Sequence, residues 1–450
     1  MQLGAILAHG VGGRSDLPVP VWLFSYGAGS ALVISFVTLH ILWRKPRLDA
    51  VAVGVPAPSW IKSLAAPTAF ILRLLGLAIF GLVITAAWFG DKSAVSNISP
   101  IVVYVLFWVG LQAACLIFGD LWALLSPWNT LGLVVERFRR LPQSTVPNDG
   151  HSDNDSSTHW PATLGIGGFV WLELCYHDPA SPRVIAIALS IYTFAMVVVL
   201  VRHGRQRLSV ADGFAAWFGL LASMAPIYRD NNQGSYGPTN LRLRWPFTGL
   251  AEVKPRRGTL ALIMVVLGST AFDGLSRSNW WRNLADDYSG WGSTIVSSIG
   301  LSSTIVIMAA AYFGAMKMVA SIGGRESSDL ETAFLSSLIP IALAYAIGHY
   351  FSLFIFEGQQ VFAQASDPFG RGWDLFGTID WVVNYNLIST DLISWIQVIA
   401  IVGGHVTGVV IAHDRAMAMF DIKVATKSQI PLLVVMVTYT IGGLTLLLGA

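Results

Sequence analysis

Apolar segments of about 20 residues recur along almost the whole chain, separated by short polar stretches. A helix of about 20 apolar residues crosses the ~30 Å hydrocarbon core of a bilayer. Because lipid offers no hydrogen bonds, such a segment must satisfy its own backbone groups, which a helix does. Only 12% of the 450 residues are charged, whereas soluble domains carry about 25%. The sequence therefore predicts an all-α integral membrane protein, built as a single polytopic domain over residues 1–450.

Ten of these apolar segments are predicted to cross the membrane, which gives a bundle of about 10 transmembrane helices. The predicted spans are residues 21–43, 67–89, 99–125, 162–177, 183–201, 259–275, 294–320, 330–356, 391–412 and 430–448. The span at 162–177 is short. We find no internal repeat that would divide the bundle, so one domain is the simplest interpretation.

An eleventh apolar segment, residues 210–228, is predicted not to cross, although its crossing would give 11 spans. Lys and Arg gather in four loops, at 44–47, 136–140, 202–207 and 254–257. The positive-inside rule places such loops in the cytoplasm. Two of them flank the eleventh segment, which also contains Asp212, Gly213 and Pro226. We therefore expect a re-entrant or interfacial segment there, and both termini on the outer side of the inner (plasma) membrane.

Three polar stretches are predicted outside the spans. Residues 1–19 are a polar N-terminal tail, and His9 in it would become N-terminal if a longer precursor were cleaved after Ala8. Residues 141–160 are rich in Asn, Asp, Ser and Thr, and they have too little apolar area to offset the entropy of ordering. We expect a disordered cytoplasmic loop there. Residues 357–390 combine Gly, Pro and aromatic residues and are expected to form an ordered outer loop that caps the bundle.

Two histidines lie deep in consecutive spans, His349 and His405. An ionisable side chain in a bilayer is costly and usually marks a functional site. At 1.5 Å per residue, both fall near the middle of the membrane, where two imidazoles could bind a zinc-like divalent metal ion, a haem iron or copper. His413, at the inner end of the same span as His405, is a third candidate metal ligand. The alternative is that each histidine is hydrogen-bonded locally and has no shared role.

Two carboxylates and a tyrosine are candidates to complete a catalytic site. Glu173 and Asp273 lie toward the outer side of their spans, where either could be a base or a further metal ligand. Tyr345 precedes His349 by four residues and so shares its helix face, where its hydroxyl could orient a substrate. A metal ion would lower the pKa of bound water to about 7 and supply a hydroxide nucleophile. The alternative is that both carboxylates are interfacial and bind nothing.

Two other functional classes fit the same features. A transporter or permease is expected to combine many spans, a re-entrant segment and polar residues at the midplane. A haem or copper redox protein would use His349 and His405 as ligands. The net charge of +2 is too small to predict binding to nucleic acid. The predicted partners are therefore membrane lipid and a small apolar substrate.

Several strings of residues carry a resemblance to one family. They are AHGVGGR at 8–14, DLPVP at 16–20, WLF at 22–24, YGA at 26–28, SPWNT at 126–130, TAFDG at 270–274, HYFS at 349–352, GRGWDLFG at 370–377, GHV at 404–406 and AHDRA at 412–416. Together they resemble a bacterial membrane family named fenitrothion hydrolase, over nearly the whole chain.

The resemblance implies hydrolysis of the aryl ester bond of an apolar organophosphorus triester. It supplies no catalytic residues, so the site remains the one argued above. The expected reaction is in-line attack of a metal-bound hydroxide on phosphorus. The nitrophenolate that leaves is a stable anion, so little acid catalysis is expected to be needed.

Overall fold

The computed structural model describes residues 20–139, 158–230 and 240–448. Within them, nine helical segments are long and apolar enough to span a membrane, so the chain is a multi-pass membrane protein. They are α2 (Val21–Leu42), α4 (Ser59–Phe89), a segment made of α5 (Ile98–Pro100), η1 (Ile101–Gly110) and α6 (Leu111–Phe118), α10 (Pro182–His203), α13 (Thr259–Ser276), α15 (Trp291–Gly323), a segment containing α17 (Ile339–Phe356), α19 (Thr390–Met419), and a segment containing α21 (Ile430–Leu448). The predicted all-α bundle is confirmed.

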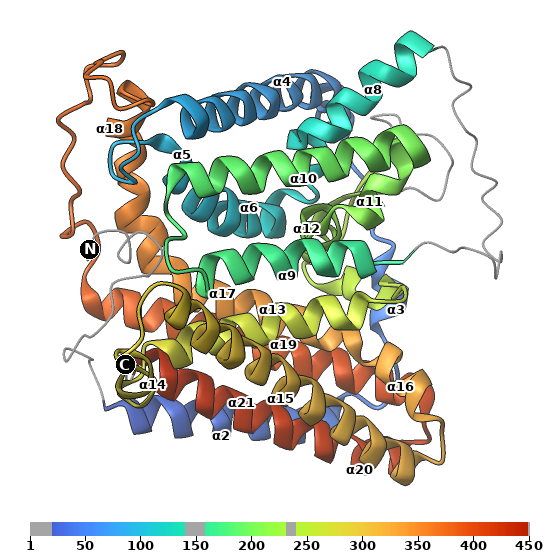
Figure 1. The fold of residues 1–450 in the computed structure, drawn as a ribbon. Coiled ribbons are helices and arrows are strands. Elements are labelled where there is room, and N and C mark those ends of the chain that lie inside the picture. The colour runs from blue at the N-terminus through green and yellow to red at the C-terminus, as the bar shows by residue number, and fades with distance from the viewer. Residues whose placement is uncertain (1–19, 140–157, 231–239, 449–450) are drawn as a thin grey trace.

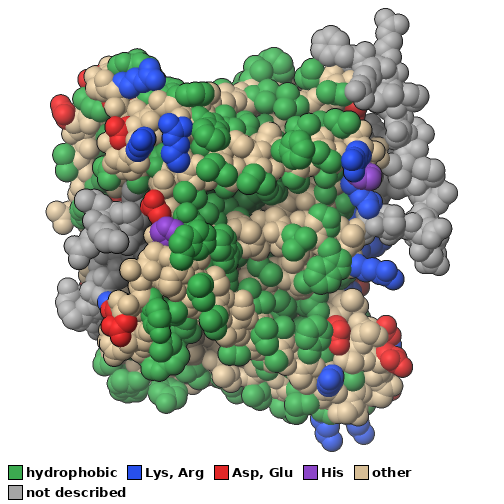
Figure 2. All heavy atoms as spheres, viewed as in Figure 1, with side chains coloured by type: hydrophobic (Ala, Val, Ile, Leu, Met, Phe, Trp, Pro, Cys, Tyr) green, Lys and Arg blue, Asp and Glu red, His purple; other side chains and the backbone are tan. Residues whose placement is uncertain are grey.

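The long helices run side by side between two ends of the molecule (Figure 1). We name these ends by their short helices, the α18 end and the α20 end. The α18 end carries α14 (Asn279–Ala285) and α18 (Gln360–Ser366), and the α20 end carries α3 (Leu48–Ala52), α16 (Ser327–Ala333) and α20 (Ile422–Ser428). Figure 2 shows hydrophobic side chains across the middle of one face and charged side chains toward the two ends. This distribution is the one expected of a bundle that faces lipid along its waist.

A shorter helix, α9 (Trp160–Leu174), occupies the position of the short predicted span at 162–177. Its 15 residues rise about 22 Å, less than a typical span. It nevertheless runs beside α13 between the same two ends (Figure 1), and its Gly165 lies against Tyr192 of α10. With the nine longer segments of the described chain, α9 agrees with the predicted total of about 10.

Two predicted spans are interrupted. The span predicted at 99–125 ends at Phe118, because Gly119 adopts a positive φ of 83° that a helix cannot continue through. The chain then forms α7 (Trp122–Leu125) and α8 (Pro127–Arg139). The span predicted at 330–356 begins later, at Ile339, after a 3₁₀ turn (Leu335–Leu338), with Pro340 in the first turn of α17.

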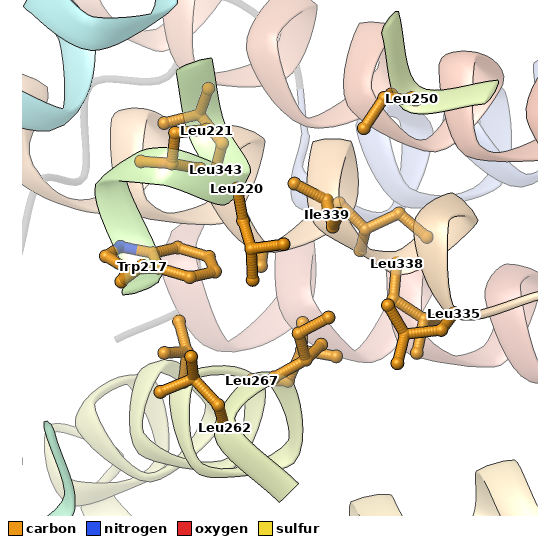
Figure 3. Close-up of a cluster of buried hydrophobic side chains, with 14 of the residues drawn as sticks. Trp217, Leu220, Leu221, Leu250, Leu262, Leu267, Leu335, Leu338, Ile339 and Leu343 are labelled. Atoms are coloured by element: carbon orange, nitrogen blue, oxygen red, sulfur yellow. The ribbon is translucent and has the colours of Figure 1, made fainter. Parts of the chain in front are cut away.

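The doubtful segment 210–228 does not cross, as predicted. It forms α11 (Leu208–Ala211), α12 (Gly213–Ala222) and the start of a small sheet. At ten residues, α12 is about 15 Å long, and the chain returns to the α20 end after it. Its apolar side chains pack between α13 and the start of α17, as Figure 3 shows for Trp217 and Leu220 with Leu262 and Leu267. The segment is therefore re-entrant and part of the core.

The small sheet closes the α20 end. Its three antiparallel strands have the order β1 (Val55–Pro56), β3 (Leu241–Leu243), β2 (Ile227–Arg229). The remaining short 3₁₀ helices are η2 (Arg205–Arg207), η5 (Thr248–Glu252) and η7 (Glu357–Gln359). Since β2 is the end of the re-entrant segment and β1 joins α3 to α4, the sheet connects the end of that segment to the chain between α3 and α4.

Two of the predicted polar stretches, 1–19 and 141–160, lie outside the described residues, apart from residues 158–160. At the edge of the second, His159 is ordered, with its Nδ1 2.8 Å from the Thr259 hydroxyl. Its burial, with Arg256 nearby, lowers its pKa to about 4. The predicted outer loop lies at the α18 end (Figure 1) and is tied down there, because Asp91 N donates to Phe369 O at 2.8 Å and Ile98 N to Pro368 O at 3.3 Å.

Helices α17 and α19 approach closely, and glycines make this possible. A Cβ on Gly404 would collide with the Ala344 Cβ and lie 2.6 Å from the Pro340 carbonyl oxygen. A Cβ on Gly408 would lie 2.7 Å from the Ser337 carbonyl. This is the close backbone approach that small residues spaced by four allow between membrane helices. This close approach makes α17, which carries His349, and α19, which carries His405, adjacent helices.

We expect Gly404→Val to destabilise the bundle strongly, because the new side chain would collide with backbone that cannot rotate away. Overpacking in a tight interior costs about 1–3 kcal/mol or more. Thermal unfolding of the detergent-solubilised protein would measure this. The matched control is Gly403→Val, since nothing lies within 4 Å of a Cβ at Gly403. Equal unfolding temperatures for the two variants would contradict the close approach.

Candidate functional site

The centre of the site is a contact between Asp273 and His349. Asp273 lies in the last turn of α13, and His349 lies on α17. Oδ2 of Asp273 is 2.7 Å from Nε2 of His349, and both side chains are almost fully buried. The angles at this contact fall outside those of a regular hydrogen bond, so we describe it as a close contact between a carboxylate and an imidazole. A carboxylate beside an imidazole in a bilayer is costly to bury unless the two groups compensate each other.

Three further polar groups surround this pair. Arg277, one turn after Asp273, places Nη2 3.4 Å from its Oδ1. The Tyr350 ring is perpendicular to that of His349, with the two centroids 4.9 Å apart, and Tyr350 interacts electrostatically with Asp273. Glu173 on α9 is buried, with 3% of its surface exposed, and interacts electrostatically with Asp273 and Arg277. The arginine compensates part of the negative charge of the two carboxylates.

Tyr345 lies flat against His349. Their ring centroids are 6.1 Å apart and the rings are inclined by 17°. Two glycines leave room for this tyrosine, since a Cβ on Gly274 would lie 2.8 Å from its hydroxyl and one on Gly443 would lie 2.7 Å from its ring. The Tyr345 hydroxyl and His349 Nδ1 are both buried and have no hydrogen-bond partner among the described residues. Such groups usually find a partner in water or a ligand.

His405 is connected to this site only through aromatic rings. The Tyr439 ring centroid is 5.9 Å from that of Tyr345 and 5.9 Å from that of His405. His405 Nδ1 is 2.8 Å from the Ile401 carbonyl, which can only accept, so Nδ1 carries a proton. The contacts thus run from His349 through two tyrosines to His405. Nothing in this arrangement favours one metal ion or haem iron held by both histidines.

His413 serves a different part of the molecule. Its Nδ1 is 3.1 Å from Gln429 Oε1, and its Nε2 is 2.9 Å from the Trp43 carbonyl. The neighbouring Asp414 accepts hydrogen bonds from Trp43 Nε1 at 2.9 Å and Arg47 N at 2.7 Å. Both residues therefore fasten the end of α19 to the segment after α2, at the α20 end.

Because Asp414 accepts these bonds, Asp414→Ala is expected to destabilise the protein by about 1–3 kcal/mol, the cost of leaving partly buried donors unpaired. Asp49→Ala is the matched control, since Asp49 is exposed and its contact with Arg415 is long, at 3.9 Å. It should change the unfolding free energy by less than about 1 kcal/mol. Chemical unfolding in mixed micelles would compare the two. A larger effect at Asp49 than at Asp414 would refute this structural role.

The His, Asp and Glu side chains of this site do not suit the predicted zinc-like ion. Among the residues that the structure describes, no group of three or more His, Cys, Asp or Glu side chains could hold a metal ion. A three-ligand protein site is the common catalytic arrangement for zinc. Moreover, Nε2 of His349 and Oδ2 of Asp273 face each other at 2.7 Å. Zinc sits about 2.0–2.2 Å from each such donor, and so the contact leaves no space for a cation between them.

Of the six residues predicted from sequence, the structure brings four together: Asp273, Glu173, Tyr345 and His349. It places His405 behind two tyrosines and His413 at the α20 end. Sequence reasoning missed Arg277, Tyr350 and Tyr439. Arg277 follows Asp273 by four residues, a helix spacing that signals an ion pair. Tyr439 lies on another helix, and nothing in its sequence context indicates the contact.

This arrangement can accept and hold a proton. Nε2 of His349 faces a carboxylate and so is the protonated nitrogen of a neutral imidazole, which leaves Nδ1 as a basic lone pair. The adjacent Tyr345 hydroxyl can donate to an oxygen. In a comparison with known proteins, no family model, no curated protein and no solved structure matches this chain.

Proposed function

We propose that this protein is a membrane-embedded hydrolase of small apolar organophosphorus triesters, with His349 as its general base. The observation that supports this most is the Asp273–His349 contact with an unpartnered Nδ1 beside an unpartnered Tyr345 hydroxyl. An imidazole oriented by a carboxylate is a recurring general base in hydrolases. The resemblance of the sequence strings supports the choice of substrate class.

In the proposed reaction, His349 Nδ1 accepts a proton from water as the water oxygen attacks phosphorus. The phosphorus–oxygen bond to the aryl group breaks, and the aryloxide leaves with the electron pair. Asp273 holds the Nε2 proton and stabilises the imidazolium that forms. Tyr345 donates a hydrogen bond to the phosphoryl oxygen as it gains negative charge. General base catalysis of this kind typically contributes about 10²–10⁴-fold.

Arg277 and Tyr350 have supporting roles in this proposal. Arg277 contacts Asp273, and the Tyr350 ring lies 4.9 Å from the His349 ring, centroid to centroid. By fixing Asp273 and the His349 ring, they keep His349 in the tautomer that exposes a basic Nδ1. They are positioning residues, and Glu173 balances the charge of Arg277.

The assay that tests the function uses purified protein in lipid vesicles and a dimethyl nitrophenyl phosphotriester. We expect release of nitrophenolate, and in ¹⁸O-labelled water the label should enter the phosphate product. Incorporation into the phenol would place the attack on the ring and contradict the proposed reaction. No release above that from vesicles with an unrelated membrane protein would reject the function.

Chelators should leave this activity unchanged, since the proposed base needs no metal ion. Activity is compared before and after dialysis against EDTA, with metal content followed by mass spectrometry. Loss of activity on dialysis and its return with one added metal would restore the metal-assisted mechanism predicted from sequence. A Soret band in the purified protein would instead support the haem alternative.

A proton-coupled transporter is the second candidate. The observation that favours it is the enclosure of four ionisable groups, Glu173, Asp273, Arg277 and His349, inside the bundle. Such groups in transporters bind protons or substrates at the midplane. Accumulation of an intact triester in sealed vesicles that depends on a pH gradient, without nitrophenolate release, would favour transport over hydrolysis.

We also propose the orientation of the protein in an inner membrane. The basic loops around Arg44–Arg47 and Arg205–Arg207 adjoin α3 and α11, at the α20 end. The positive-inside rule would place that end in the cytoplasm and both termini outside. Asp273 on α13 and His349 on α17 meet in the half of the bundle nearer the α18 end. Their contact would then lie closer to the outer face.

A further inference from the structure

Part of the outer loop presents apolar side chains that the described part of the protein does not cover. Residues 371–387, which we name the apolar loop, lie between α18 and α19 at the α18 end (Figure 1). All of them except Thr378 and Val383 are exposed. The large exposed side chains are Trp373, Leu375, Phe376, Ile379, Trp381, Val382, Tyr385 and Leu387. A large exposed apolar patch usually marks an interaction site.

The backbone of the apolar loop is held by hydrogen bonds to neighbouring elements. The hydroxyl of Ser366, a buried residue of α18, accepts from Phe376 N at 3.0 Å and from Thr378 N at 3.2 Å. Farther along, Asn384 N donates to Gln359 Oε1 at 3.0 Å. The exposed apolar side chains are therefore presented by an ordered backbone.

The apolar loop lies at the ends of two long membrane helices. Just before it, the Phe369 carbonyl accepts from Asp91 N at 2.8 Å, directly after α4 ends at Phe89. Just after it, α19 begins at Thr390. With 31 and 30 residues, these helices are each about 45 Å long. A bilayer with its headgroups measures about 40–45 Å, so the loop lies at headgroup level.

Lipid-facing side chains adjoin the apolar loop on both sides. On α19, Leu392, Trp395 and Ile399 are exposed, and their spacing of three and four residues places them on one face of the helix. On the other side, Phe89 at the end of α4 is 70% exposed. Both helices are long and apolar enough to span a membrane. The apolar surface of the loop is thus continuous with the surface that the bundle turns toward lipid.

The charges of the apolar loop indicate which kind of lipid contact it suits. Its charged residues are Arg371, Asp374 and Asp380, one positive and two negative. The Arg371 guanidinium already lies over the rings of Phe369 and Trp373, 5.4 and 5.6 Å from their centroids. Attraction to anionic headgroups takes a cluster of Lys and Arg, which this loop lacks. Tryptophan and tyrosine, by contrast, are enriched where hydrocarbon meets the headgroups.

We propose that the apolar loop is embedded in the lipid leaflet at the α18 end. Leu375, Phe376 and Val382 lie among the acyl chains, while Trp373 and Trp381 lie at the headgroups. The occupant of this surface is therefore the bilayer itself, and zwitterionic lipid is sufficient because the contact is apolar. This inference goes beyond the proposed hydrolase function and does not depend on it.

A fluorophore in the apolar loop tests the proposal. Phe376→Cys and Val382→Cys are each labelled with nitrobenzoxadiazole, and unlabelled background is low because the native Cys115 and Cys175 are buried. The full-length protein is placed in phosphatidylcholine vesicles, with and without lipid that carries a spin label near the carbonyl end of one acyl chain. Quenching by this lipid is compared with quenching by aqueous iodide.

Two matched positions provide the controls. Leu164→Cys lies on α9 at a residue that is 75% exposed to lipid, and Ser328→Cys lies on the exposed surface of α16 between polar residues. We expect the spin-labelled lipid to quench Phe376→Cys and Val382→Cys as strongly as Leu164→Cys and several times more strongly than Ser328→Cys. Iodide should quench only Ser328→Cys strongly.

Two other outcomes would overturn the proposal. Quenching of both loop labels by iodide and not by lipid would place the apolar loop in water. Loop labels that neither reagent reaches would show that protein covers this surface, either a second copy of the chain or residues 1–19. Activity toward a nitrophenyl triester is measured separately, so that failure of the hydrolase proposal and failure of the lipid contact are distinguished.

Discussion

His349→Gln is expected to reduce hydrolysis of the nitrophenyl triester by about 10²–10⁴-fold, the contribution typical of a general base. Gln retains a side chain able to contact Asp273 but has no basic nitrogen to accept the proton of water. The loss should appear in kcat rather than in KM, since His349 acts on water and not on the apolar arms of the substrate. Steady-state kinetics in vesicles would measure it.

The informative control is His405→Gln. His405 is as deeply buried as His349 but is separated from it by Tyr345 and Tyr439. If His349 acts with Asp273 as proposed, His405→Gln should retain activity within a few-fold. Losses of equal size in the two variants would instead indicate the shared histidine site first predicted from the sequence. Folding of each variant is checked by its elution and unfolding temperature.

Asp273→Leu is expected to destabilise the protein by about 3–5 kcal/mol, the usual cost of removing one partner of a buried ion pair. The substitution removes the carboxylate that lies 3.4 Å from the Arg277 guanidinium. It also removes the carboxylate from His349 Nε2, 2.7 Å away in the native protein. Unfolding in mixed micelles would give the change in free energy, and activity should be lost as well.

A double variant separates the charge from the shape of the side chain. In Asp273→Leu/Arg277→Leu the positive charge that Asp273 compensates is removed as well, so most of the lost stability should return, while hydrolysis should stay absent. Buried ion pairs replaced by apolar residues often show this recovery. A double variant as unstable as Asp273→Leu alone would mean that packing around Asp273 sets the stability, rather than charge.

The sequence by itself determined the fold class and the membrane segments. Apolar length fixes where helices cross, because the bilayer has one thickness and leaves no other way to satisfy the backbone. Charge in the flanking loops correctly indicated that residues 210–228 return to the end at which they begin. The interruption at Gly119 was missed. Its positive φ goes with a tertiary contact, because a Cβ at Gly119 would lie 2.6 Å from the Ile227 carbonyl oxygen.

Only the tertiary structure decided which polar residues meet. Depth along a helix is readable from sequence, and it placed His349 and His405 at compatible depths. The direction in which each side chain points depends on which helices are neighbours and how each is rotated. Helix α13 brings Asp273 to His349, whereas α21 places Tyr439 beside His405. Which polar side chains contact one another is thus a property of helix packing. Small residues such as Gly274, Gly404 and Gly443 determine this packing, because they allow close approach.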